Sequence, residues 1–129
     1  MTKAEKIADA EAEILKVLWA NGEAMTSRQI RDALGDESNW QRTTVQTLIR
    51  RLVEKEVLLL EERGDKGTYY YSPTVTEEEF TSSRTVEFLK KIFNGNPKML
   101  VSTMLNNNIM SDDDINDIKN HWKERKGNK

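Results

Sequence analysis

The spacing of hydrophobic and polar residues is most regular between residues 39 and 53. Five apolar residues recur there at intervals of three and four positions, which places all of them on one helical face: Val45, Leu48, Ile49, Leu52 and Val53. The other face is polar and carries Arg42, Thr43, Thr44, Gln46, Thr47, Arg50 and Arg51. The pattern predicts an amphipathic helix with one face in a core and the other in solvent.

Two runs of apolar, β-branched and aromatic residues follow this helix, at 57–62 and 68–72. The turn residues between them include Gly64 and Gly67, so the pattern predicts a β-hairpin. Three consecutive tyrosines in the second run suggest stacking on single-stranded nucleic acid. Neighbouring side chains on a strand point to opposite faces, however, so Tyr70 separates from Tyr69 and Tyr71, and we expect one face to join the core.

Two more helices are predicted upstream, over residues 8–20 and 27–34. Asn21 and Gly22 tolerate the left-handed conformation that ends a helix, and Thr26 and Gln29 have the spacing of a capping box that starts one. The order helix, helix, helix, strand, turn, strand is that of a winged helix-turn-helix domain. The fold class expected is mainly α with a small β-hairpin.

The pattern changes after Pro73. Helices are predicted near 77–93, 97–105 and 111–126, with cap residues at Thr76, Asn96 and Ser111. Three short helices cannot enclose all their own apolar side chains, so we expect a homodimer to cover them. We therefore divide the chain into a winged helix domain at 1–74 and a helical dimerisation domain at 75–129. The expected dimer contacts are Phe80, Leu89, Ile92, Phe93, Leu100, Val101, Met104, Leu105, Ile115, Ile118 and Trp122.

Composition narrows the class of protein. The 129 residues include no cysteine, no apolar stretch long enough to span a membrane, and no apolar core of a signal peptide near the start. We expect a soluble, cytoplasmic protein without disulfides. The net charge of −2 argues against a nonspecific coating of nucleic acid. Positive charge is instead local, because no acidic residue occurs from Ser38 to Val53.

The acid-free helix face favours binding to duplex DNA. Arginine can fork onto guanine, glutamine can read adenine, and threonine can contact phosphate or a thymine methyl group. We expect bases to be read by Thr43, Thr44, Gln46, Thr47 and Arg51. Phosphate contacts are expected from Arg28, Arg50 and Lys66, the last at the tip of the hairpin. An ordinary solvated helix face is the alternative for this helix taken alone.

Catalytic and metal chemistry have no support in the sequence. The single histidine, His121, has no ligand-type companions, and the carboxylates of 112–114 are explained by capping of a helix start. There is no nucleophile with a base and no glycine-rich phosphate loop. We expect no enzyme activity, no cofactor and no metal.

Four stretches of the sequence carry a resemblance: DAEAEILKVLW at 9–19, NW at 39–40, TVQTLIRRL at 44–52 and YYYSP at 69–73. Together they resemble the penicillinase repressor family, the BlaI/MecI group that also includes copper-responsive CopY-type repressors. The resemblance covers nearly the whole chain and is strongest from 9 to 73. It implies a homodimeric repressor that binds palindromic TACA/TGTA operators and controls an operon of antibiotic resistance or metal homeostasis. Its implied DNA contacts are Arg42, Thr43, Thr44, Gln46, Thr47, Arg51 and Lys66.

The chain also departs from the family pattern. Without cysteine it cannot sense copper through thiolates as CopY-type members do, and Gln46 stands where a positively charged residue is common. The β-lactam repressors are inactivated by cleavage at an Asn-Phe bond, where this chain aligns Thr103 and Met104. A membrane sensor protease is therefore an expected partner by resemblance only. The competing hypothesis is a winged helix adaptor that binds proteins and not DNA, which the acidic net charge would suit.

Overall fold

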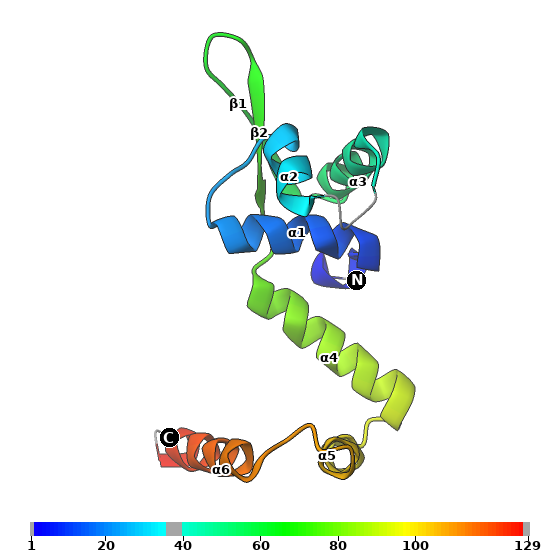
Figure 1. Ribbon diagram of the computed structural model, residues 1–129, viewed down its shortest axis with the longest axis vertical. Helices are drawn as coiled ribbons and strands as arrows, with labels where there is room; N and C mark the ends of the chain where they lie inside the picture. The colour runs from blue at the N-terminus through cyan, green and yellow to red at the C-terminus, as the bar shows by residue number, and fades with distance from the viewer. Residues whose placement is uncertain (1, 36–39, 128–129) are drawn as a thin grey trace. The chain divides into compact units, whose positions relative to one another are not determined.

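The computed structural model describes residues 2–35 and 40–127, so the expected lead-in at Asn39 lies outside the described residues. The chain separates into two compact units, Met1–Arg84 and Thr85–Lys129. In chain order the elements are η1 (Ala4–Lys6), α1 (Asp9–Asn21), α2 (Ser27–Leu34), α3 (Arg42–Glu54), β1 (Leu58–Arg63), β2 (Thr68–Pro73), α4 (Glu77–Phe93), α5 (Pro97–Asn106) and α6 (Asp112–Gly127) (Figure 1). The predicted fold class and element order are confirmed.

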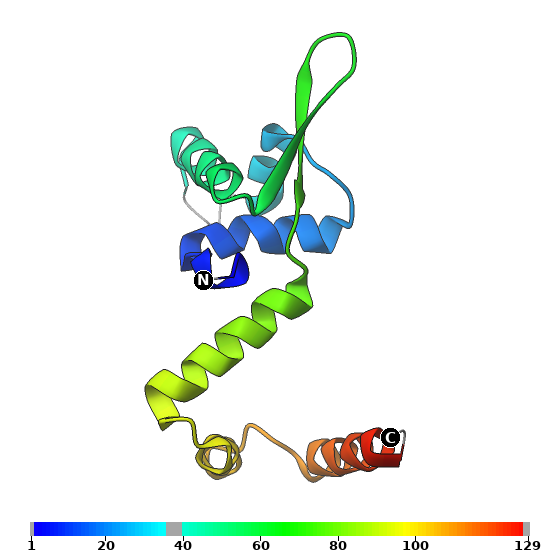
Figure 2. The ribbon, with the colours of Figure 1, turned by 180° about the vertical axis from the view of Figure 1, so that it is seen from behind.

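The core of the first unit lies where α1, α2 and α3 meet. The apolar stripe of α1 contributes Ile14, Leu15 and Leu18, and α2 contributes Ile30, all of them fully buried. Both α2 and α3 pack against the same helix, α1 (Figures 1 and 2). Three helices with one apolar face each thus bury those faces against one another and leave their polar faces outside.

The helix ends follow from local sequence. Gly22 ends α1 in the left-handed conformation, with a φ of 79°, and its N–H donates to the Leu18 carbonyl. At the start of α2 the Thr26 hydroxyl accepts from the Gln29 N–H, while the Gln29 side chain accepts from the Thr26 N–H. This reciprocal capping box is the one predicted, and it fixes where α2 begins beside α3.

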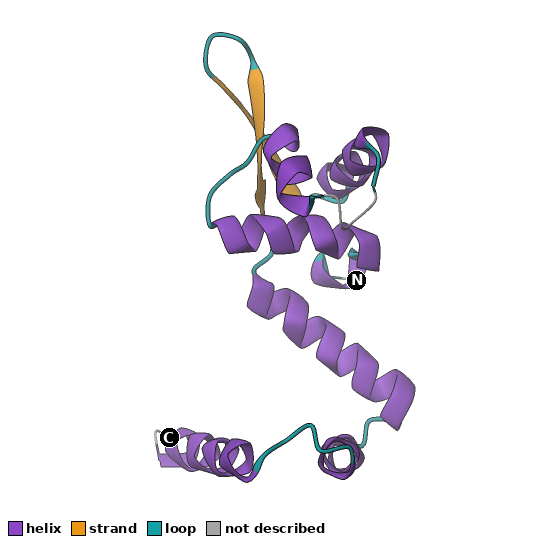
Figure 3. Ribbon diagram, in the orientation of Figure 1, coloured by secondary structure: helices purple, strands orange, loops and turns teal. Residues whose placement is uncertain are grey.

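The hairpin is an antiparallel pair that projects past the helices of the first unit (Figure 3). Its register places Leu60 opposite Tyr71 and Glu61 opposite Tyr70. Near its base, Met25 and Tyr71 exchange both backbone hydrogen bonds, which ties β2 to the segment between α1 and α2. Tyr71 packs against the core, as predicted for one tyrosine face, and burial raises the pKa of its phenol.

The boundary between the two units falls within α4. The first turns of α4 belong with the winged helix, because Phe80 packs against its core and its ring lies 5.6 Å from that of Trp19. A functional boundary near residue 74 stays a prediction. No helix among the described residues is both long and apolar enough to cross a membrane.

The second unit leaves many apolar side chains in solvent. Of the residues expected at a dimer contact, Phe93 is buried and packs edge-on against Phe88. Four more are half-buried: Leu89, Leu100, Met104 and Ile115. The others in this unit are 40–62% exposed: Ile92, Val101, Leu105, Ile118 and Trp122. So many exposed apolar side chains on three helices are typical of an interaction surface.

Candidate nucleic-acid interface

The candidate site is built on α3, whose two faces separate cleanly. Its stripe of Val45, Leu48, Ile49 and Leu52 is buried, and Val53 packs against the same core from a half-buried position. This packing fixes the rotation of the helix about its axis. The polar side chains of the opposite face are therefore held outward, all exposed except the half-buried Thr47: Arg42, Thr43, Thr44, Gln46, Thr47, Arg50 and Arg51.

Contacts within α3 differ among these side chains. The Thr47 hydroxyl donates to the Thr43 carbonyl at 2.8 Å, so its proton is engaged within the helix. Its methyl group and oxygen lone pairs are the parts that remain for a ligand. Arg50 lies 3.9 Å from Glu54, but both side chains are about two-thirds exposed, so this pair holds the guanidinium only weakly. Within the described residues Arg51 forms no ion pair.

A hollow of about 250 Å³ is lined by residues of α2, α3 and both strands of the hairpin. The base of the hairpin packs against both helices, β1 against α3 and β2 against α2 (Figures 1 and 2). The hollow brings Gln46 and Arg50 of α3 together with Ser27 at the first position of α2 and Leu60 and Tyr71 at the base of the hairpin. Arg28 follows Ser27 and is exposed. The N-terminus of α2, where the Thr26 hydroxyl already accepts from the Gln29 N–H, thus lies beside two polar side chains of α3.

The hairpin tip carries Lys66 between two glycines, Gly64 and Gly67, with φ values of 80° and 65°. A Cβ at Gly67 would lie 2.7 Å from Glu62 Oε1, the movable end of a side chain, so the left-handed φ is what favours glycine there. Residues 58–73 hold two basic and three acidic residues, a net charge of 2 − 3 = −1, whereas residues 42–53 hold three arginines and no acid, a net +3. Positive potential is therefore centred on α3 and not on the hairpin.

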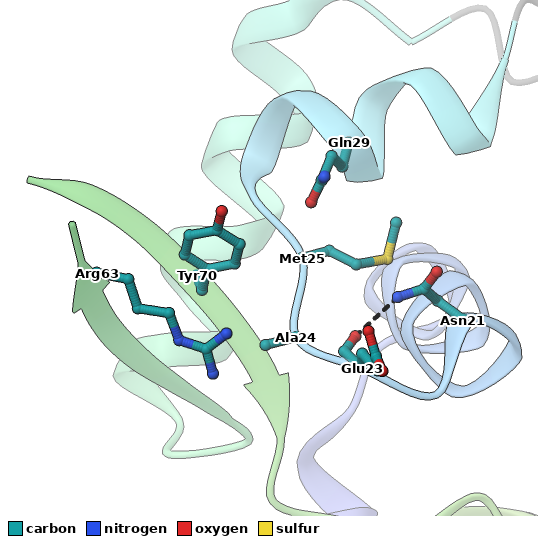
Figure 4. A pocket seen from close by; sticks show the side chains of 7 residues that line it. All are labelled: Asn21, Glu23, Ala24, Met25, Gln29, Arg63 and Tyr70. Carbon is teal, nitrogen blue, oxygen red and sulfur yellow. Dashed lines mark hydrogen bonds between the residues drawn. The ribbon is translucent and has the colours of Figure 1, made fainter. Parts of the chain in front are cut away.

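Sequence reasoning missed Arg63, the second cation of the hairpin. Its guanidinium lies 4.8 Å from the Tyr70 ring centroid and 3.1 Å from the Glu61 carboxylate, which raises the pKa of Arg63. Figure 4 shows it beside Tyr70 at the edge of an open hollow of about 700 Å³, which Glu23 and Gln29 also line. The sequence does hold a signal for the Arg63–Glu61 pair, because Arg63 lies two residues after Glu61 and so on the same face of the strand.

Among the described residues no three His, Cys, Asp or Glu side chains are grouped so that they could hold a metal ion. His121 is exposed on α6. Asp114 accepts from the Ser111 N–H at 2.9 Å, and its own N–H donates to the Ser111 hydroxyl. Capping therefore accounts for this carboxylate.

Comparison with known proteins adds an observation that is independent of this geometry. The family model described as "Penicillinase repressor" matches residues 7–124. The chain belongs to the penicillinase repressor family. The penicillinase repressor of Bacillus licheniformis is 30% identical over 129 residues, which cover 100% of this chain and 98% of that protein. The methicillin resistance regulatory protein MecI of Staphylococcus aureus is 25% identical over 92% of this chain and 94% of its own.

Solved structures agree with the assignment to the penicillinase repressor family. The DNA binding domain of the repressor BlaI superposes with a TM-score of 0.51 at 30% sequence identity. The match covers 61% of this chain and 93% of that domain. The resemblance seen in the sequence is thereby confirmed, and so is the winged helix. The individual contact residues stay predictions.

Proposed function

We propose that this penicillinase repressor family member is a homodimer that binds a palindromic operator with TACA/TGTA-type half-sites. The observation that carries the proposal is the acid-free polar face of α3, with its three exposed arginines, held outward by a buried apolar stripe. An α-helix fits into the major groove of DNA, and two copies of α3 related by a twofold axis would read two half-sites.

The residues of α3 divide by chemistry. Arg51 suits a bidentate contact to guanine and Gln46 a bidentate contact to adenine. The threonines Thr43, Thr44 and Thr47 suit thymine methyl groups and phosphates. Phosphate contacts from Arg28, Arg42, Arg50 and Lys66 would set the register of the protein on the duplex without specifying sequence.

Dimerisation through the second unit is part of the proposal. Its exposed apolar side chains, such as Ile92, Ile118 and Trp122, would be covered by a second copy of the chain. Avidity then links the two half-sites, so a change that separates the copies releases the operator. We propose that this protein is released from its operator when a membrane sensor protease cleaves α5, the helix that contains Thr103 and Met104.

Duplex binding by the full chain tests this function. We expect Arg51→Ala to weaken binding to a TACA/TGTA palindrome by about 5- to 150-fold at fixed salt, the equivalent of roughly 1–3 kcal/mol. The matched control is Lys16→Ala, which removes one positive charge from an exposed position on α1 and should leave affinity nearly unchanged. Fluorescence anisotropy at several salt concentrations measures both variants and the number of phosphates neutralised.

The alternative is a winged helix adaptor that binds protein. The net charge of −2 and the acidic hairpin favour it. No specific affinity of the wild-type chain for duplex DNA, together with no dependence on salt, would support the adaptor and contradict the repressor.

A further inference from the structure

The start of α4 is fastened to the winged helix at its first turn. Val75, just before the helix, is buried, and its carbonyl accepts a hydrogen bond from Trp19 Nε1 at 3.0 Å. The rings of Trp19 and Phe80 lie 5.6 Å apart in a tilted arrangement. Trp19 belongs to the last turns of α1. This first attachment therefore joins the beginning of α4 to the C-terminal part of α1.

A second attachment lies one turn further along α4, at Arg84. Arg84 Nη1 donates to the Asp9 carboxylate at 2.6 Å, and Nη2 donates to the Ile7 backbone carbonyl. The same guanidinium lies 5.1 Å from the ring centroid of Phe80. Asp9 is the first residue of α1, and Ile7 is buried. The fork of Arg84 therefore joins α4 to the opposite end of α1.

Two attachments act differently from one. A helix held at one point can swing about it, whereas contacts at two separated points restrict that swing. Because the Asp9 side chain is 94% exposed, the hydrogen bond to the carbonyl of buried Ile7 is the stronger part of the second contact. Trp19 and Asp9 are ten residues apart on α1, which corresponds to about 15 Å along the helix axis. Arginine is suited to the second contact because its planar fork binds a carboxylate and a carbonyl at once. Arg84 is also the last residue of the first unit, and α4 continues without a break into the second.

We propose that Arg84 is a positioning residue that sets which half-site separation the dimer accepts. By holding the first turns of α4 against α1, it would restrict the separations at which two α3 helices can bind together. The inference rests on the proposed function, because it needs a dimer on a two-half-site operator. Loss of the fork leaves α3 intact but spreads the second copy over more orientations, which lowers its effective concentration at the second half-site.

The test compares duplexes with one half-site and with two half-sites whose separation is changed one base pair at a time. We expect Arg84→Ala to bind the single half-site as wild type does, within about twofold. On the optimal two-half-site duplex it should bind about tenfold more weakly, and its preference among separations should flatten. Arg84→Lys, which can make one of the two hydrogen bonds, should fall between. Lys90→Ala removes an exposed positive charge from the same helix and is the matched control.

The outcomes separate the two claims. If the wild type prefers one separation and Arg84→Ala keeps the same preference and affinity, the inference is overturned. The proposed function is then unaffected. An equal loss on single and double half-sites also overturns it, because that result assigns Arg84 a purely structural role. Absence of specific duplex binding by the wild type contradicts the proposed function itself. Sedimentation of Arg84→Ala as a dimer shows that assembly is preserved.

Discussion

Replacing Lys55 by methionine tests the packing that holds α3 in place. Lys55 caps the C-terminus of α3, and its Nζ lies 2.6 Å from Oε1 of Glu11 on α1 and 2.9 Å from the Lys6 carbonyl oxygen. The Glu11 side chain is only 2% exposed, and the same oxygen accepts from the Ala8 N–H at 3.0 Å. Without Lys55 the buried carboxylate keeps one hydrogen bond and loses its counter-charge.

The size of the effect follows from the geometry. Two unit charges 2.6 Å apart attract by about 6 kcal/mol at an effective dielectric constant of about 20. Desolvation of the carboxylate offsets part of this attraction, and loss of one partner from a buried pair costs about 3–5 kcal/mol. Lys55 is 32% exposed, which places the expected loss of unfolding free energy at the lower end, about 3 kcal/mol. Methionine keeps the apolar stem, so the loss reports charge and hydrogen bonding.

Urea unfolding followed by tryptophan fluorescence measures this loss. Lys16→Met is the matched control, because it breaks an exposed pair with Glu13 at 3.0 Å and should cost about 0.5 kcal/mol or less. A cycle with Glu11→Gln should return a coupling free energy of about 2 kcal/mol between Lys55 and Glu11. If Lys55→Met costs no more than the control, the buried pair does not stabilise the fold and the reasoning is refuted.

Two further predictions concern a strained turn and a helix cap. Glu56 has a φ of 63°, so Glu56→Gly should raise the free energy of unfolding by about 1 kcal/mol in the same assay, and a decrease would contradict the strain. Hydrogen bonds from the Ser111 backbone and side chain lower the pKa of Asp114 in the folded protein below its ordinary value of 3.8. The stabilisation from this cap is therefore complete above pH 3.8 and is lost as the pH falls through the lower pKa of the folded protein. Ser111→Ala should raise the pKa of Asp114 toward 3.8 in a carboxyl NMR titration, and an unchanged pKa would show that the hydroxyl plays no part.

Local patterns predicted most of the fold. The i, i+3, i+4 stripe located α3, the Thr26 and Gln29 pair located the start of α2, and glycines located the hairpin turn, because each signal lies within a few residues of the structure it determines. The same stripe decided which face of α3 points outward. The polar residues of that face could therefore be chosen from the spacing of the apolar residues alone.

Interactions between distant elements were not predictable. Lys55 meets Glu11 across 44 residues, and Arg84 meets Asp9 across 75. Nothing in the spacing of these charges distinguishes them from solvated surface pairs, since their pairing depends on how α1 packs against α3 and α4. Phe80 illustrates the same limit, because its apolar character suits a dimer contact as well as the packing against Trp19 that the structure contains.

Chemical-shift mapping of the labelled full chain during titration with a TACA/TGTA palindrome tests whether α3 is the DNA-reading surface. We expect the largest shifts on the exposed face of α3, with further shifts at Arg28 and at Lys66 in the hairpin turn. The same chain with a scrambled duplex should show weaker shifts that disappear as salt rises. Specific binding with shifts elsewhere and none at Gln46 and Arg51, or no specific binding at all, would contradict the account.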